Sequence, residues 1–195
     1  MAPVESVHVT LADRGDLAAM LALSNDSATR SVANFATAPE PLEAWVATFE
    51  HASAVYPWLV AKVGERVVGF ARGLSHHVRG AYAWSADVSV YVAYDAHGQR
   101  IGTRLYERLL PTLQAQGYAT LLAGITVPNP ASERLHERFG FVRCATYHRV
   151  GWKFGSWRDV GYWELHLHTR EDAPQAIEPV HAVWDRGPAS GSAGG

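Results

Sequence analysis

The clearest hydrophobic pattern in the chain is an alternation of valines with a serine and a tyrosine from Val88 to Val92. A period of two with β-branched and aromatic side chains predicts a β-strand. The loop Ala96–Gly102 follows this strand and opens a helix. The apolar residues of that helix recur at fourfold spacing, at Ile101, Leu105, Leu109 and Leu113. This spacing indicates a helix with one buried face.

The other hydrophobic segments predict further strands and helices on both sides of this unit. We expect strands at residues 7–11, 58–63, 67–74, 119–127, 141–150 and 160–167. We expect helices from Asp13, an N-cap, to about Leu23, then at residues 41–51 and 130–139. Residues 24–40 and 152–159 are read as loops. The resulting order, β-α-α-β-β-β-α-β-α-β-β, predicts mixed α/β architecture with a mostly antiparallel sheet.

Prolines and glycines add local expectations. Pro111 lies inside the helix that begins near Ile101 and predicts a kink, while Gly117 is the expected C-cap of that helix. From Ala173 onward the chain is rich in Pro, Gly, Ala and Ser. We therefore expect one domain at residues 7–168 and a tail, 173–195, that is disordered or merely draped over it.

Composition narrows the class of protein. The chain has 195 residues, 48% of them hydrophobic and 18% charged, which suits one compact domain with a sizeable core. The formal charge of −2 gives no sign of a nucleic-acid partner. The one cysteine, Cys144, cannot form an internal disulfide and favours a reducing cytoplasm. The N-terminus lacks a signal-peptide pattern and no apolar run reaches transmembrane length, so no membrane partner is expected.

The loop Ala96–Gly102 carries the first candidate chemistry. A helix N-terminus presents unpaired N–H groups and a positive dipole, so this strand-loop-helix unit can hold the phosphate of a cofactor. Neither the dinucleotide pattern G-x-G-x-x-G nor the P-loop Lys-Ser/Thr pair is present. On these residues alone, a turn without any ligand explains the pattern equally well.

A family resemblance gives this loop a more specific meaning. The segment His97-Gly98-Gln99-Arg100-Ile101-Gly102 resembles the R/Q-x-x-G-x-G/A loop of the GNAT acetyltransferases, whose amides grip the pyrophosphate of coenzyme A. His97 stands where that loop has Arg or Gln, and Arg100 replaces the middle glycine. The segment N-P-A-S-E-R-L-H-E-R-F-G-F, residues 129–141, resembles the second GNAT signature.

Other segments resemble the phosphinothricin acetyltransferase family within the GNAT superfamily. They are V-A-N-F, Y-P-W-L-V-A, S-V-Y-V and the hairpin F-G-S-W-R-D-V-G-Y-W-E-L. The resemblance covers Val7 to Leu167 and implies a GNAT fold in a single domain. It also implies acetyl transfer from acetyl-CoA to the amino group of a small amino acid or analogue, of the phosphinothricin, methionine sulfone or methionine sulfoximine type. The alternatives are a protein or peptide acceptor, or a weakly active CoA-binding sensor.

The resemblance also implies catalytic residues. Asp87 stands where the family usually has Glu and is the candidate base; its side chain is one methylene shorter, so we expect it to act through water. A solvated strand end is the alternative. His136 is the candidate acid or proton relay, with a structural role equally open. The remaining cofactor-binding residues that the resemblance implies are Val90, Tyr91, Val92, His97, Gly98, Gln99, Arg100, Ile101, Gly102, Thr103, Asn129 and Ser132.

Acceptor-binding residues follow from the same resemblance. They are Phe35, Arg79, Tyr82, Ser89 and Tyr91. From the residues alone, Phe35 is read first as a loop anchor under the core, and the two tyrosines are equally consistent with strand packing. Arg79 is the expected partner of an acid group.

Three further expectations concern the acceptor, assembly and metals. His77 stands where phosphinothricin-acetylating members have Lys, which counts against phosphinothricin itself. An aromatic hairpin suggests a homodimer; its residues are Trp152, Phe154, Trp157, Tyr162 and Trp163. No metal is expected, since the histidines have no carboxylate or cysteine at ligand spacing.

Overall fold

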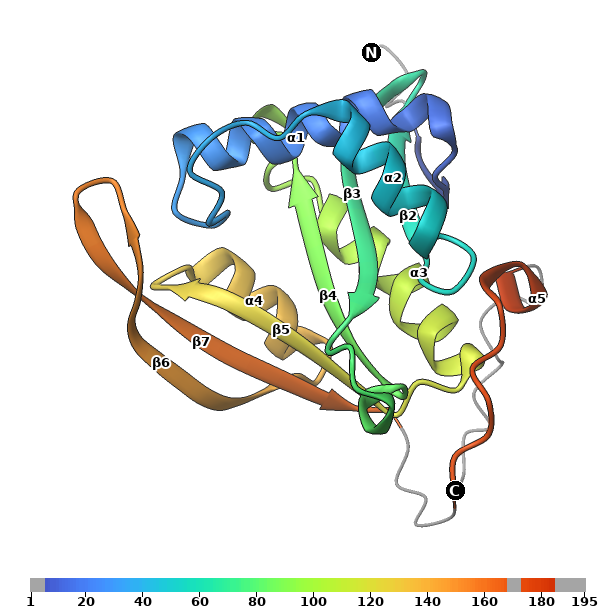
Figure 1. The fold of residues 1–195 in the computed structure, drawn as a ribbon. Coiled ribbons are helices and arrows are strands. Elements are labelled where there is room, and N and C mark those ends of the chain that lie inside the picture. Colours follow the sequence, from blue (N-terminus) through green and yellow to red (C-terminus); the bar gives the residue numbers. More distant parts are fainter. Residues whose placement is uncertain (1–5, 168–172, 185–195) are drawn as a thin grey trace.

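Seven strands form one sheet with helices on both faces in the computed structural model, which describes residues 6–167 and 173–184 (Figure 1). The strands are β1 (Val7–Leu11), β2 (Trp58–Val63), β3 (Arg66–Ser75), β4 (Ser85–Val92), β5 (Thr120–Val127), β6 (Val142–Lys153) and β7 (Ser156–His166). The helices are α1 (Leu17–Arg30), α2 (Leu42–Ala52), α3 (Ile101–Gln116), α4 (Pro130–Arg138) and α5 (Val180–Trp184). The predicted mixed α/β fold is confirmed.

The order of strands in the sheet is β1-β2-β3-β4-β5-β7-β6. All neighbours pair antiparallel except β4 and β5, which are parallel. These two strands pair only where Ser85–Asp87 lies beside Thr120–Leu122. Beyond Asp87 they diverge, so the middle of the sheet opens between two strands that would otherwise be hydrogen-bonded.

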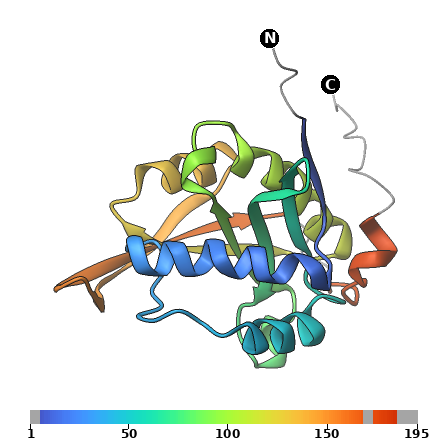
Figure 2. The same cartoon turned by 90° about the horizontal axis from the view of Figure 1, so that it is seen from above.

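The helices divide into two layers, which Figure 2 shows from above: α1 and α2 on one side of the sheet, α3 and α4 on the other. The predicted fourfold apolar face of α3 is fully buried against one face of the sheet. On the opposite face, Met20 and Trp45 from α1 and α2 pack on Trp58 and Phe70 of β2 and β3. Each such side chain contributes roughly 1.5–3 kcal/mol by leaving water, so both faces of β3 and β4 are held firmly.

Helix α1 is longer than predicted, because residues 24–30, read as loop, continue it. Its sheet-facing side is made there by the small residues Ser24 and Ala28, both buried. Asp26 and Arg30 form an ion pair one turn apart on its surface, at 3.2 Å. The helix therefore lacks the large apolar residues on which the prediction of its end relied.

The hairpin of β6 and β7 is also longer than predicted. Residues 152–159, read as a loop, belong to the two strands except for a tight turn at Phe154–Gly155. Both turn residues have positive φ, 49° and 71°, as in the turns that suit strand twist. Trp152 and Trp157 pair across the strands with ring centroids 5.5 Å apart. The hairpin projects beyond the rest of the sheet (Figure 1).

Residues 173–184, at the start of the tail expected to be disordered or draped over the domain, include a short helix, α5, that packs on the domain. Val180 and Val183 of α5 are buried, and the Gln116 side chain donates to the carbonyls of Val55 and Glu178, both at 2.7 Å. Residues 168–172 and 185–195 lie outside the described residues. Helix α3 continues through Pro111 and ends at Gly117, which has a φ of 102°, as its C-cap role requires.

Candidate active site

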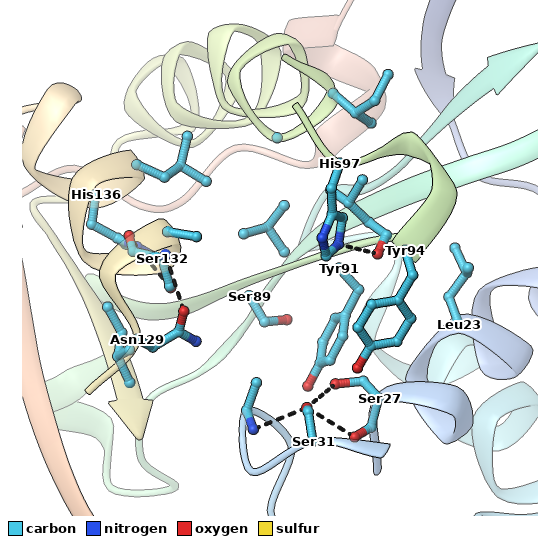
Figure 3. A pocket seen from close by; sticks show the side chains of 18 of the residues that line it. Leu23, Ser27, Ser31, Ser89, Tyr91, Tyr94, His97, Asn129, Ser132 and His136 are labelled. Carbon is cyan, nitrogen blue, oxygen red and sulfur yellow. Dashed lines mark hydrogen bonds between the residues drawn. The ribbon is translucent and has the colours of Figure 1, made fainter. Parts of the chain in front are cut away.

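A cleft of about 670 Å³ occupies the opening between β4 and β5. Five elements line it: the end of α1, strands β4 and β5, the loop that begins α3, and the start of α4. Figure 3 shows Ser89 and Tyr91 between Asn129 of α4 and Ser31 at the end of α1. The divergence of two strands, rather than a gap between domains, therefore creates the site.

The loop before α3 presents free amides to this cleft. The first helical bond of α3 is from Arg104 N to Arg100 O, at 3.0 Å, so the N–H groups of the first turn, residues 101–103, have no intrahelical partner. No side chain caps this end of the helix. The unpaired amides and the helix dipole together make an anion site.

Two residues of the loop have unusual requirements. Arg100 adopts the left-handed conformation with a φ of 60°, which costs a non-glycine residue about 1–2 kcal/mol. A Cβ on Gly102 would lie 3.1 Å from Cδ2 of Leu135, so a larger residue must push into the wall formed by α4. Gly102 thus occupies the position with little space for a side chain, whereas Arg100 occupies the position with the strained backbone.

The backbone of β4 supplies further donors. Ala93 N donates to Val68 O at 2.9 Å, and antiparallel bonds alternate along a strand. The N–H groups of Val90 and Val92 therefore point away from β3, toward the gap left by β5. His97 Nε2 lies 3.1 Å from the Val92 carbonyl; since a carbonyl only accepts, this nitrogen is protonated and donates.

Asp87 lies at the point where β4 and β5 separate, and His76 is its partner. Oδ1 of Asp87 is 2.8 Å from Nδ1 of His76. Burial raises the pKa of Asp87 above its usual range, although the hydrogen bond from His76 opposes this shift. An ionised carboxylate only accepts, so Nδ1 carries the proton and Nε2 of His76 is a free basic nitrogen. The pair can take up one proton from a neighbouring group.

His136 is buried at the cleft wall and both its ring nitrogens are occupied. Nδ1 lies 2.8 Å from the Ser132 carbonyl and must donate to it, which leaves Nε2 to accept from the Tyr106 hydroxyl at 2.9 Å. Burial lowers the pKa of His136 and raises that of Tyr106. His136 is therefore held neutral, which agrees with the structural reading left open above.

The other residues expected at the cofactor lie around the cleft with one exception. Asn129 caps α4 by accepting from Ser132 N at 3.3 Å, and both residues line the cleft together with the loop residues 97–98 and 100–103. Gln99 is not part of the lining; its side chain donates to the Asp95 carbonyl at 3.2 Å. Asn129 thus serves as a helix cap and keeps its amide nitrogen for a ligand.

The expected acceptor residues divide into two groups. Ser89 and Tyr91 line the cleft, where Tyr91 stacks on Phe70 with centroids 4.9 Å apart and burial raises its pKa. Arg79 and Tyr82 lie exposed on the connection from β3 to β4, and Tyr82 contacts the rings of both His76 and His77. The second group thus flanks the Asp87–His76 pair rather than the cleft itself.

Phe35 lies on the loop between α1 and α2 and is 37% exposed. Its ring occupies the space in which a Cβ on Gly151 would stand, so it packs on the backbone of β6. Lys153 ties the same loop to the hairpin, because its buried Nζ donates to the carbonyls of Ala28, Asn34 and Ala36. Phe35 therefore joins the α1–α2 loop to the hairpin.

Comparison with known proteins decides the family. The model of the acetyltransferase (GNAT) family matches residues 11–141. The chain belongs to the GNAT family. It is 34% identical to a phosphinothricin N-acetyltransferase of Streptomyces viridochromogenes, over 91% of this chain and 96% of the relative. It is 33% identical to a methionine sulfoximine/methionine sulfone acetyltransferase of Pseudomonas aeruginosa, over 87% and 99%.

A solved structure gives the same result. An acetyltransferase from Salmonella typhimurium, determined with its cofactor acetyl-CoA, superposes with a TM-score of 0.83 at 29% identity, covering 88% of this chain and 99% of that one. This GNAT protein is thus an acetyl-CoA-dependent N-acetyltransferase. Its cleft fits that cosubstrate, since unpaired amides of the α3 N-terminus and of β4 line it.

Three groups in this acetyltransferase escaped sequence analysis. Ser27 and Ser31 line the cleft from the end of α1, which was read as loop. His76 is one of the histidines for which no metal site is expected, and its pairing with Asp87 depends on the register in which Leu74 faces Asp87. Lys153 reaches the α1–α2 loop across more than a hundred residues, and no local pattern signals such a contact.

Two further findings concern residues 6–167 and 173–184 of this acetyltransferase. Within them, no group of three or more His, Cys, Asp or Glu residues is arranged to hold a metal ion. Nor does any of their helices have the length and apolar character that crossing a membrane requires.

Proposed function

We propose that this enzyme acetylates the α-amino group of a small amino acid or amino-acid analogue, of the phosphinothricin, methionine sulfone or methionine sulfoximine type. The observation that carries this proposal is the Asp87–His76 pair at the point where β4 and β5 separate. The pair lies beside aromatic residues, and relatives named for these acceptors match nearly the whole chain.

Residues of the cleft would hold acetyl-CoA. The amides of residues 101–103 and the α3 dipole suit its pyrophosphate, and the amide nitrogen of Asn129 suits a second contact. Acetyl-CoA supplies an activated acyl group as a thioester. The N–H of Val90 or Val92 points into the gap and can donate to the thioester oxygen as negative charge develops there.

The Asp87–His76 pair would remove the proton from the acceptor's ammonium group, because only a neutral amine attacks a thioester. Asp87 holds the histidine in the tautomer whose Nε2 is free, as an acid does in a catalytic triad. The Asp87 side chain is one methylene shorter than the usual glutamate. His76, or a water molecule bound by the pair, would therefore lie between Asp87 and the ammonium group and take the proton. His136, buried and neutral, would hold the wall of the cleft through Tyr106.

Phe35, Arg79, Tyr82, Ser89 and Tyr91 would surround the acceptor. Tyr162 also faces this region. Burial raises the pKa of its hydroxyl most, Tyr147 raises it further, and Asp87 makes a third contribution in the same direction. His77, in place of a lysine, favours an acceptor other than phosphinothricin.

A thiol-release assay with acetyl-CoA tests this function across phosphinothricin, methionine sulfone, methionine sulfoximine, ordinary amino acids and a peptide pool. Turnover on a small amino acid supports it. Turnover on peptides alone supports a protein or peptide acceptor. Stabilisation by acetyl-CoA in a thermal melt, without turnover on any amine, supports a CoA-binding sensor.

We further propose a homodimer in the cytoplasm. Three of the five aromatic residues suggested for the interface are about half exposed on the hairpin: Trp152 at 57%, Phe154 at 56% and Trp157 at 49%. Trp163 is 1% exposed and belongs to the core, so its proposed place in an interface is wrong. Light scattering at micromolar concentration should give twice the monomer mass, and a monomer mass would reject the dimer. The single free Cys144 supports a reducing compartment.

A further inference from the structure

Arg72 of β3 lies directly across from Ser89 of β4 in the sheet register. The next pair on the same sheet face is Phe70 and Tyr91, whose rings stack. Side chains two residues apart on a strand share a face, so Asp87 also lies on this side. Arg72 is therefore a neighbour, across one strand, of residues from both the cleft and the candidate base pair.

The guanidinium of Arg72 is enclosed by aromatic rings. Its central carbon lies 4.5 Å from the ring centroids of both Trp45 and Trp58. These rings hold its position by cation–π contact and remove water from it. Burial lowers the pKa of Arg72, yet an arginine side chain keeps its charge in a protein.

This cation has no anionic partner among the described residues. No ion pair within 4.0 Å includes Arg72, and its buried Nε has no hydrogen-bond partner. Tyr91 and Glu40 both raise the pKa of Arg72 against this burial. Burial raises the pKa of the Tyr91 phenol, which keeps it neutral, and the Glu40 carboxylate accepts the Trp45 indole N–H at 2.6 Å. Buried charges in proteins are normally paired, so this guanidinium is suited to an anion that comes from outside the chain.

Ser89 links this guanidinium to the cleft. Its hydroxyl is also buried without a hydrogen-bond partner in the described part of the chain, while the residue lines the cleft. Two unpaired donors, one on each of two neighbouring strands, are thus about 5 Å apart at the backbone. An oxyanion placed between them satisfies both.

We propose that Arg72, assisted by the Ser89 hydroxyl, binds the α-carboxylate of the acceptor; this rests on the function proposed above. In an α-amino acid the amine and the carboxylate share one carbon atom. Asp87 is two residues from Ser89 on the same strand, about 7 Å along it. A carboxylate between Arg72 and Ser89 therefore leaves the amine on the side of the Asp87–His76 pair, as the reaction requires.

Arg72 is better suited than Arg79 to bind this carboxylate. Arg79 is exposed, and ion pairs between exposed groups contribute little. The half-buried guanidinium of Arg72 is held by two indoles and is preorganised for bidentate binding. Arg72 thus selects acceptors with a free carboxylate and excludes amines in which that group is amidated or continues into a peptide.

Steady-state kinetics with a matched pair of acceptors, methionine sulfone and its α-carboxamide, test the proposal. Arg72→Gln should raise KM for methionine sulfone roughly 10- to 100-fold, as loss of a charged hydrogen bond predicts, with KM for acetyl-CoA and for the carboxamide unchanged. Arg72→Lys, which keeps a point charge without the fork, should lie between. Arg14→Gln, on the surface, should match the parent. Equal losses with both acceptors, or no loss, would overturn the proposal.

Binding measurements separate this proposal from the proposed function. If the parent enzyme releases no thiol with any acceptor, the function fails, and titration calorimetry with methionine sulfone in the presence of coenzyme A then tests Arg72 alone. Binding to the parent that Arg72→Gln weakens at least tenfold supports the carboxylate site. Absence of binding to the parent, or equal binding to both, overturns it. Arg72→Lys replaces Arg72→Gln in each arm if circular dichroism shows that the glutamine variant does not fold.

Discussion

The cofactor side and the acceptor side of this active site are built in different ways. The cofactor side is mostly backbone: amides of the α3 N-terminus and of β4, from segments close together in the sequence. The acceptor side that we propose is made of side chains from β3, β4, the α1–α2 loop and the hairpin, and some of these segments lie more than a hundred residues apart in the sequence. Binding of a common cosubstrate can rely on backbone geometry, whereas choice of acceptor depends on which side chains the fold brings together.

Replacement of the base should have the largest effect and should leave the cofactor side intact. Asp87→Ala is expected to lower kcat by roughly 10²- to 10⁴-fold, the usual contribution of a positioned base, with KM for acetyl-CoA nearly unchanged. Asp87→Glu is the matched variant; if the short side chain makes the enzyme depend on His76 or water, Glu should retain or improve turnover. Parent-like rates for Ala, Asn and Glu would show that Asp87 is only a solvated strand end.

The raised pKa of Asp87 gives this prediction a pH dependence. Turnover should fall as pH drops through that raised pKa, because the base must be ionised. The free energy of unfolding should change with pH in the opposite direction. A carboxyl group whose pKa is raised in the folded protein stabilises the fold at low pH, and this stabilisation is lost as the pH rises through the raised pKa. Asp87→Asn should thus raise the melting temperature at pH 7 while it lowers turnover; a lower melting temperature would argue against an unfavourably buried carboxylate.

A negative charge at the α3 N-terminus should weaken the binding of acetyl-CoA and leave the binding of the acceptor unchanged. Gly102→Asp places a carboxylate where the pyrophosphate is expected and presses on Leu135. We expect KM for acetyl-CoA to rise roughly 10- to 100-fold, the equivalent of losing a charged hydrogen bond, with the acceptor preference unchanged. Gly102→Ala adds only the methyl group and measures the steric part. If KM for Gly102→Asp equals that of the parent, this loop does not bind the phosphates.

Loss of the hydrogen bonds that hold the α1–α2 loop should destabilise the fold and thereby weaken binding of the acceptor. Lys153→Met leaves the carbonyls of Ala28, Asn34 and Ala36 without their donor. The free energy of unfolding, from urea denaturation, should fall by about 1–3 kcal/mol. KM for the acceptor should rise because Phe35 loses its support, while KM for acetyl-CoA should not. Unchanged stability would mean that Lys153 is not a structural tie.

Relief of strain in the cofactor loop should have the smallest effect. Arg100→Gly removes a non-glycine residue from a φ of 60° and should raise the free energy of unfolding by about 1 kcal/mol. Arg100→Ala loses the guanidinium but keeps the strain, so it should show no gain. If the two variants are equally stable, the left-handed conformation is not the cause.

The same contrast explains what sequence could predict. Local sequence patterns determine the order of elements and the loop from His97 to Gly102, so both could be predicted from the sequence alone. Arg72 could not, because its role depends on its position opposite Ser89 in the sheet and on its contact with Trp45 of helix α2. The end of α1 is not evident from the sequence because the residues buried there, Ser24 and Ala28, are small. Helix α5 is not evident because it lies in a Pro- and Ala-rich segment that nevertheless packs on α3.

The identity of the acceptor can be tested directly by comparing acceptors in one assay. Thiol release from acetyl-CoA should be measured with methionine sulfone, methionine sulfoximine and phosphinothricin, each as the free acid and as the α-carboxamide, and with a peptide pool. We expect turnover on at least one free acid, with kcat/KM roughly 10- to 100-fold above that of its carboxamide, and none on peptides. Faster turnover on peptides or carboxamides than on every free acid would contradict it.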